Sequence, residues 1–411
     1  MKKGFYSFLL LLVAIYFTSC TTDDVSSIDN SITAPATYIF ERNGETSISF
    51  SGQTTRILMA EEIIEALKNP KFSEVQLNAM YNHVAGEKDF SNPDLNASDK
   101  VIRSKTAASF DFFAGSANNA IVADFEEWIA AQVNEVYPVW NNTASIGVAG
   151  GLQEAGGGTI RYINDRGLEL NQAFGKSLIG ALMVDQILNN YISDNVLDPF
   201  EAANDAETLV EDKNYTEMEH DWDEAYGYLF GTASNVATPL DDIGDDLDGS
   251  DSFLNKYLDR VNDDPDFNGI AQEIYNAFKL GRAAIVAKNY TVRNEQAEII
   301  REKISEVIGI RSVFYLQQAK TTLEANDNPD YAAAFHDMSE AFGFIYSLQF
   351  TRLPNSISPY VTGNEVDSIL EMIYTNKTNG FWDLTPTDLQ TASETIASKF
   401  NFTVTQAANS N

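Results

Sequence analysis

One ten-residue pattern occurs twice in the chain, beginning at His220 and again at His336. The copies read HDWDEAYGYL and HDMSEAFGFI, so five of the ten positions are identical. The chain has only 3 histidines, and two of them begin these copies. A pattern that returns after so long an interval predicts an internally duplicated helical protein. It also gives each half of the chain a His/Glu pair at the same place.

The predicted fold is mainly α: an internally duplicated helical bundle with a small N-terminal β-hairpin. The helix before each copy contains an Ile-Gly pair, ending at Gly180 and at Gly309, so the similarity extends beyond the ten residues. We therefore place the two related halves at about 167–232 and 294–350. Two helix-pair units of this kind would pack about a pseudo-twofold axis, as in a helix bundle.

The hairpin is expected within 37–50, where short strand-like runs flank Asn43-Gly44, a pair that favours tight hairpin turns. The glycine-rich stretch at 148–158 is expected to form tight turns, because glycine adopts positive φ without steric cost. Elsewhere the apolar residues recur with helical spacing. This spacing predicts helices at 57–67, 72–83, 118–136, 168–192, 215–230, 253–261, 268–288, 293–323, 330–350, 365–374 and 387–400.

The N-terminal segment predicts export and lipid anchoring. Two lysines precede an apolar run at 8–17, which is too short to span a membrane, and small residues lead to Cys20, the only cysteine. This order is typical of a bacterial lipoprotein cleavage site. We predict a signal peptide at 1–19, acylation of Cys20, a flexible tether at 20–36 and a helical domain at 37–411. An ordinary signal peptide with an incidental cysteine is the alternative.

The expected location is the outer membrane. Asp23 and Asp24 follow the cysteine and resemble the acidic export signal of surface lipoproteins, so cell-surface exposure is favoured over the periplasmic face. An acylated Cys20 leaves no thiol for disulfides or for cysteine-ligated metals. The formal net charge of -33 excludes nucleic acid as an expected partner, since binding it needs a cationic surface.

The best site candidates are His220 with Glu224 and His336 with Glu340. Residues four apart on a helix share a face, and an imidazole and a carboxylate so placed can bind one metal ion. The cofactor is unknown, with iron, zinc or calcium as the candidate ions. The alternative is structural: two ligands per helix are few for tight metal binding, and a buried His–Glu pair can order a bundle.

The aspartates at 241–251 form a dense acidic loop. Asp245, Asp246, Asp248 and Asp251 are its candidate calcium ligands, although the loop lacks the EF-hand pattern. A solvated acidic loop without bound metal is the competing interpretation. No catalytic residues are assigned, because the chain has neither Gly-x-Ser-x-Gly nor His-Glu-x-x-His. Enzymatic activity is therefore left open, with a non-enzymatic role favoured.

Several short segments carry a resemblance to known lipoproteins: Tyr38-x-Phe40-Glu41-Arg42, Ser51-Gly52-Gln53-Thr54-x-Arg56, Gly180-Ala181 and Trp222-Asp-Glu224-Ala-Tyr226-Gly227. At these residues the chain resembles a family of Bacteroidetes lipoproteins filed as a domain of unknown function, number 4856. More distantly it is similar to the imelysin, or insulin-cleaving-metalloproteinase-like, lipoproteins, which are helical, built from two related bundles and associated with iron uptake. Their signature is Gly-x-His-x-x-Glu, whereas three residues separate His220 from Glu224 here.

The leading functional hypothesis is an outer-membrane-anchored, non-enzymatic binding component of iron, haem or other nutrient acquisition. In it the four His and Glu residues contact the metal or ligand, and an outer-membrane transporter is a candidate partner. An imelysin-like metallopeptidase is one alternative. A structural or partner-docking surface lipoprotein is the other.

Overall fold

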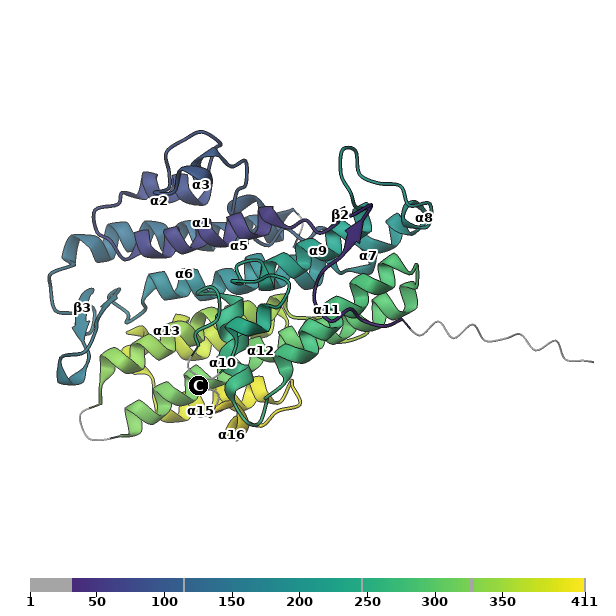
Figure 1. Ribbon diagram of the computed structural model, residues 1–411. Coiled ribbons are helices and arrows are strands. Elements are labelled where there is room, and N and C mark those ends of the chain that lie inside the picture. The colour runs from purple at the N-terminus through teal and green to yellow at the C-terminus, as the bar shows by residue number, and fades with distance from the viewer. Residues whose placement is uncertain (1–31, 114, 245–246, 326–328, 410–411) are drawn as a thin grey trace, which may run out of the picture. The chain divides into compact units, whose positions relative to one another are not determined.

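The computed structural model (Figure 1) describes residues 32–113, 115–244, 247–325 and 329–409. The predicted signal peptide, Cys20 and most of the predicted tether lie outside these residues, as do Asp245 and Asp246. Thr33–Asn411 forms one structural unit. It is mainly helical, as predicted from the apolar spacing. No helix among the described residues is long and apolar enough to cross a membrane.

The predicted N-terminal hairpin is present. Strands β1 (Glu41–Arg42) and β2 (Glu45–Thr46) pair antiparallel, and Phe40 O accepts a hydrogen bond from Ser47 N at 2.9 Å. The turn residues Asn43 and Gly44 have φ of 56° and 83°. Two positive φ values are what a type I′ turn requires, which explains the choice of Asn-Gly.

A second hairpin was not predicted. Strands β3 (Gly150–Gln153) and β4 (Ile160–Ile163) pair antiparallel within and after the stretch expected to form only tight turns. A Cβ at Gly150 would lie 2.5 Å from Asn142 O, and one at Gly151 would lie 2.9 Å from the Ile160 side chain. Glycine is therefore needed where β3 closely approaches its neighbours. Because glycine has no side chain, the glycines of β3 do not show the alternating apolar pattern that predicts a strand.

The helices of the first group begin after the β1–β2 hairpin and end with the first copy of the repeated pattern, on α9. In chain order they are α1 (Ser51–Leu67), α2 (Glu74–Tyr81), α3 (Pro93–Ala97), η1 (Arg103–Lys105), α4 (Phe110–Phe113), α5 (Ser116–Ala131), η2 (Gln132–Val136), η3 (Tyr137–Val139), η4 (Ala155–Gly157), α6 (Leu170–Leu178), η5 (Ile179–Tyr191), α7 (Asp194–Leu197), η6 (Asp198–Phe200), α8 (Glu201–Asp205) and α9 (Glu217–Phe230).

The second group of helices follows α9 and carries the other copy on α13. Its helices are η7 (Pro239–Asp242), α10 (Leu254–Asp263), α11 (Ile270–Val286), α12 (Tyr290–Glu324), α13 (Tyr331–Ser347), η8 (Leu348–Phe350), α14 (Gly363–Leu370), η9 (Glu371–Thr375), η10 (Gly380–Asp383), α15 (Pro386–Ala397) and α16 (Val404–Ala407).

Local sequence sets several helix starts. Thr216 caps α9 by accepting from Glu219 N, while the Glu219 side chain accepts from Thr216 N. Ser73 with Gln76 on α2 and Thr385 with Asp388 on α15 form the same reciprocal box. Each box satisfies backbone N–H groups that a helix N-terminus otherwise leaves unpaired.

The helix formed by α6 and η5 runs through the centre of this unit (Figure 1). Its α6 part packs against α13, α1 and α5, and its η5 part packs against α9. Of the 13 residues of η5, all but Asn190 are buried. A helix buried on every side is a core helix. The long α12 packs along α11, α13 and α15.

Two glycines, Gly180 on η5 and Gly343 on α13, let α13 approach the central helix closely. A Cβ at Gly180 would lie 2.5 Å from Ser347 Cα, and one at Gly343 would lie 2.9 Å from Ser177 N. Gly180 N also donates to Ser347 Oγ at 3.1 Å. In the other copy, Gly227 packs against the Phe50 side chain. Packing therefore excludes a larger side chain at these glycines, while the internal duplication of the fold stays a prediction.

Candidate functional site

The first His/Glu pair lies on α9 and is tied to the segment before α1. His220 Nδ1 lies 3.0 Å from Ser49 O, so this nitrogen donates, because a carbonyl only accepts. The imidazole stacks on Tyr215 at a centroid distance of 4.6 Å, and its Nε2 lies 3.8 Å from Glu224 Oε1. Glu224 Oε1 accepts from Gln53 Nε2 at 2.7 Å. These contacts connect α9 with the start of α1.

The second pair lies on α13 and has a carboxylate where the first has a carbonyl. His336 Nδ1 lies 2.8 Å from Glu169 Oε1 and 3.1 Å from an Arg161 guanidinium nitrogen. Arginine only donates and a carboxylate only accepts, so the shorter contact fixes a proton on Nδ1. Burial lowers the pKa of His336, but Glu169 and Glu340 outweigh it and the pKa is raised.

Glu340 is a buried carboxylate held in its charged form. Burial raises its pKa, but Lys176 and His336 oppose this, together with a hydrogen bond from Tyr315 and the nearby Arg311, and bring the pKa down to about 2. Lys176 Nζ lies 3.4 Å from Glu340 Oε1, and His336 Nε2 lies 3.9 Å from the same atom. A carboxylate so placed serves as an anchor for surrounding cations.

Asp221 and Asp337 are site residues that sequence reasoning missed. They follow the histidine in each copy, and they are identical in the two copies. Burial raises the pKa of Asp221 to about 8, with Glu224 adding to the shift. Burial also raises the pKa of Asp337 to about 7, where His336 opposes the shift and Glu340 adds to it. Their identity within the repeat is the signal that could have found them.

A cavity of about 460 Å³, here called the His336 cavity, opens beside the second pair. Its charged and histidine side chains come from elements far apart in the sequence: Glu61, Glu65, Lys68, Arg161, Lys176, Lys256, Arg260, Arg311, His336, Asp337 and Glu340. Six of these are Lys or Arg, against four Asp or Glu. The whole chain carries 27 Lys and Arg against 60 Asp and Glu, so the local balance is reversed.

Glu224 and Glu340 have similar surroundings, since an arginine and two buried tyrosines lie near each of them. Tyr191 and Tyr228, with ring centroids 6.2 Å apart, have pKa values raised by burial and further by Glu224, while Arg56 opposes the shift.

Beside the other copy, Tyr257 and Tyr315 lie 6.4 Å apart between ring centroids. Burial raises the pKa of both, Glu340 adds to the shift, and Arg311 opposes it. Each copy therefore places one histidine, one aspartate and one glutamate beside an arginine and two tyrosines.

The described residues contain no group of three or more His, Cys, Asp or Glu side chains placed to hold one metal ion. Each predicted pair keeps the spacing expected of it, with His Nε2 within 4 Å of Glu Oε1. The predicted role of His220, Glu224, His336 and Glu340 as metal or ligand contacts stays a prediction.

The described carboxylates of the acidic loop form ion pairs and hydrogen bonds with other residues of the protein. Asp248 pairs with Lys256 and Arg260, each at 2.6 Å. Asp251 accepts from Thr232 Oγ1 at 2.8 Å and from Phe253 N at 2.9 Å, and burial raises its pKa to about 6. Since Asp245 and Asp246 lie outside the described residues, calcium binding by this loop stays a prediction.

The aromatic residues of the repeated pattern lie in the core. Trp222, Tyr226 and Phe344 are fully buried, and Phe342 is nearly so. Trp222 Nε1 donates to Phe278 O at 3.0 Å, and Tyr226 stacks on Tyr38 at 3.7 Å between centroids. These rings hold α9 and α13 in place and leave the polar face of each helix for the site.

The model of one protein family matches residues 35–403. The chain belongs to this family, described as a domain of unknown function (DUF4856). The match covers the first hairpin, both copies of the repeated pattern and the His336 cavity. No curated protein and no solved structure matches the chain.

Proposed function

We propose that this protein is a lipid-anchored outer-membrane binding protein that takes up a small anionic nutrient in the His336 cavity. The observation that carries the proposal is the reversed charge balance: six Lys and Arg side chains converge on one cavity of a chain with net charge -33. Their positive field attracts and holds an anion that the rest of the surface repels.

The cations of the cavity are held in place before any ligand arrives. Arg311 is buried, and its guanidinium carbon lies 4.1 Å from the Phe314 ring centroid and 4.6 Å from that of Tyr315. Lys176 lies over the Tyr257 ring at 4.9 Å and beside Glu340. Stacking of this kind restricts the side chains. A ligand then loses less conformational entropy on binding.

Part of the positive charge is shared with carboxylates beside the cavity. Arg161 pairs with Glu154 at 2.5 Å, and Asp248 pairs with Lys256 and Arg260. With these two, six carboxylates match the six Lys and Arg side chains, so the positive excess comes from His336 and Asp337, whose raised pKa values favour the imidazolium form and the neutral acid. This excess favours a ligand with one or two negative groups, such as a carboxylate, a phosphate or a sulfate. Arginine matches these groups with two parallel hydrogen bonds. Haem, which carries carboxylates, belongs to the same chemical class.

A metal ion alone is a weaker candidate ligand for this cavity. The carboxylate of Glu340 is engaged by Lys176, and a cation entering there would meet Arg161 and Arg311 as well. Like charges at such distances repel strongly in a partly buried site. Iron binding through the His/Glu pairs therefore enters the test as a competing outcome.

The proposed location in the outer membrane is inferred from the N-terminal sequence. The short apolar run followed by Cys20 supports acylation, and Asp23 and Asp24 support surface exposure. A binding protein at that place would pass its ligand to an outer-membrane transporter.

The test is a binding screen on the full chain purified in detergent. Titration calorimetry against small carboxylates, sugar phosphates, sulfated sugars and haem is expected to find an anion whose affinity falls with added salt. Arg161→Gln should lower the affinity for that anion about tenfold, because one charge-assisted contact is lost. The matched control is Arg103→Gln, which breaks an exposed ion pair with Glu126 outside the cavity.

Two outcomes would contradict the proposal. The first is equal affinity of the wild type and Arg161→Gln for every anion that binds. The second is stoichiometric metal in elemental analysis that disappears in His220→Ala/His336→Ala, which would favour a metal site. Chelator-sensitive cleavage of a peptide library by the same sample would point to the metallopeptidase alternative.

A further inference from the structure

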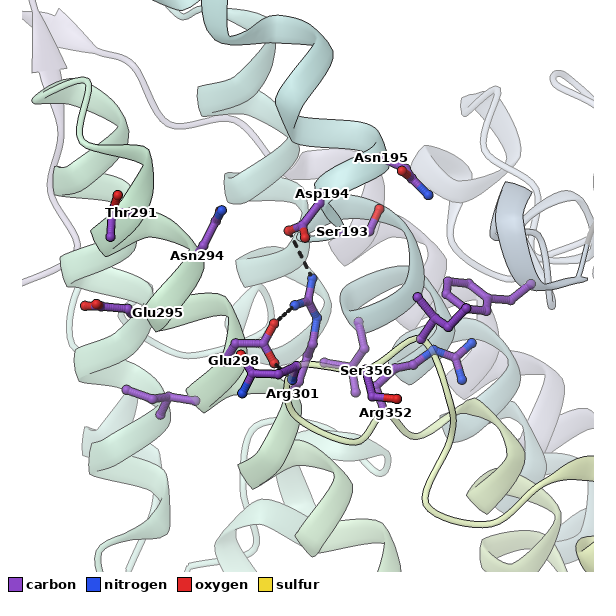
Figure 2. Close-up of a pocket in the computed structure, with 15 residues that line it drawn as sticks. Ser193, Asp194, Asn195, Thr291, Asn294, Glu295, Glu298, Arg301, Arg352 and Ser356 are labelled. Atoms are coloured by element: carbon purple, nitrogen blue, oxygen red, sulfur yellow. Dashed lines mark hydrogen bonds and ion pairs between the residues drawn. The ribbon is translucent and has the colours of Figure 1, made fainter.

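A second cavity, here called the Arg352 cavity, has a volume of about 1150 Å³. It lies between the first turns of α12, the turn after η5 and the loop that follows η8 (Figure 2). None of its lining residues belongs to the His336 cavity or to the repeated pattern. Its chemistry must therefore be read independently.

Arg352 is a buried cation with little compensation. It is 3% exposed, and its guanidinium carbon lies 3.6 Å from the Phe112 ring centroid. NH1 donates to Thr351 O at 2.9 Å. Among the described residues Nε has no hydrogen-bond partner, and Arg352 has no ion pair. A buried charge in this state is costly unless an anion joins it.

Asp185, the carboxylate that acts on Arg352 electrostatically, does not provide that anion. The charge of Asp185 raises the pKa of Arg352. Its carboxylate oxygen, however, accepts hydrogen bonds from Ser109 Oγ at 2.5 Å and from Asn189 Nδ2 at 3.0 Å. Burial accordingly lowers the pKa of Arg352 to about 10 even though Asp185 opposes the shift. The guanidinium therefore remains available for a ligand.

Arg301, the other arginine of the lining, is already neutralised. It donates to Ile192 O at 2.7 Å, forms an ion pair with Glu298 and lies 3.9 Å from Asp194. Figure 2 shows it between these two carboxylates. The two arginines thus differ: one is fully paired within the protein, and one lacks a counter-ion.

The far side of the cavity has the opposite charge. Glu295 and Glu298 lie on α12, on the side away from Arg352, and Asp194 lies between (Figure 2). Glu295 is exposed and forms no ion pair among the described residues. A ligand that was only anionic would be repelled there, whereas an ammonium group would be attracted.

Apolar side chains lie along the lining between these charged groups. Leu188 and Ile299 line the wall, and Ile357 on the loop after η8 is 80% exposed. An apolar wall combined with a few placed charged groups is typical of ligand sites.

We propose that the Arg352 cavity binds a short peptide. The C-terminal carboxylate pairs with Arg352, the N-terminal ammonium faces Glu295 and its acidic neighbours, and an apolar side chain packs against Leu188 and Ile357. This arrangement supplies the counter-ion that Arg352 lacks and keeps like charges apart. It is independent of the ligand proposed for the His336 cavity.

The test uses the full chain in detergent and the tripeptide Ala-Leu-Ala in three forms: free, C-terminally amidated and N-terminally acetylated. Calorimetry should find binding of the free form, with a loss of about tenfold or more on amidation and a smaller loss on acetylation. Arg352→Gln should lower the affinity for the free form by the same factor and leave the affinity for the amidated form unchanged. The matched control, Arg103→Gln, should bind all three forms as the wild type does.

Arg352→Lys is the second variant, in case the glutamine variant does not fold; it keeps the charge and should retain part of the discrimination. Equal affinity for the free and amidated forms would overturn the proposal, as would no binding of any form at about 5 mM. Decanoate that binds through Arg352 while peptides do not would reassign the cavity to anionic amphiphiles.

Discussion

His336 Nδ1 lies 2.8 Å from Glu169 Oε1, whereas the matching nitrogen of His220 faces a backbone carbonyl. The same motif therefore has two different electrostatic settings. On α13 the imidazole has carboxylates on both sides, Glu169 at Nδ1 and Glu340 near Nε2. This favours the imidazolium form of His336, so the stability that this pair contributes depends on pH.

The pH dependence of stability should reveal this pair. The pKa of His336 is raised in the folded state, so its stabilisation is fully present below the unfolded value of about 6.5 and is lost as pH rises through the folded value. Glu169→Gln should therefore cost most stability near pH 5.5 and progressively less towards pH 8.5, measured by denaturant unfolding. Glu126→Gln, which removes an exposed partner of Arg103, should give a small and pH-independent change. A pH-independent loss in Glu169→Gln would contradict the assignment.

Removing the cation beside Glu340 should be costly. Lys176→Met leaves a buried carboxylate with one fewer counter-ion, and we expect a loss of about 3 kcal/mol in the free energy of unfolding at pH 7. The double variant Lys176→Met/Glu340→Gln should regain much of it, because the uncompensated charge is gone. Urea unfolding of the four proteins in this cycle gives the coupling directly. Additive losses would mean that the two side chains act independently.

The helices could be read from the sequence because their signals are local. Apolar spacing located α1, α5, α9 and α13, and capping pairs such as Thr216 with Glu219 agree with it. The Asn43-Gly44 turn was equally local. The hairpin of β3 and β4 was missed because glycine occupies the first two positions of β3, where alternating side chains would mark a strand; β4 (Ile160–Ile163) has no glycine but is only four residues long.

The His336 cavity could be found only in part from the sequence. The repeat pointed to His336 and Glu340, and its shared aspartate could have added Asp337. The cations that define the chemistry come from the end of α1, from β4, α6, α10 and α12. No local pattern connects residues as distant as Lys68 and Arg311. Tertiary packing alone brings them together.

The close contact of α13 with the central helix predicts an asymmetric response to added methyl groups. Gly180→Ala would place Cβ 2.5 Å from the Ser347 backbone, so we expect a loss of about 2 kcal/mol or more from overpacking. Gly363→Ala is the matched control, because its nearest neighbour is a side-chain oxygen of Gln349 at 3.8 Å. The control should be neutral or slightly stabilising, since alanine favours helix. Thermal unfolding of both variants tests the difference, and equal melting temperatures would contradict it.

The two aspartates of the repeated pattern should behave alike on titration. The pKa is raised to about 8 for Asp221 and to about 7 for Asp337, so the folded state binds each proton more tightly than the unfolded chain does. The stabilisation is therefore present near pH 4 and is lost as pH rises through those values. Asp221→Asn should match the wild type near pH 5 and exceed it by roughly 1–3 kcal/mol at pH 9, because the amide cannot ionise. Asp337→Asn should show a smaller gain that levels off about one pH unit lower, whereas exposed Glu87→Gln should follow the wild type throughout. Denaturant unfolding between pH 5 and pH 9 measures the stability of all three variants. If one aspartate variant differed from the wild type by the same free energy at every pH, the two copies of the site would not behave alike.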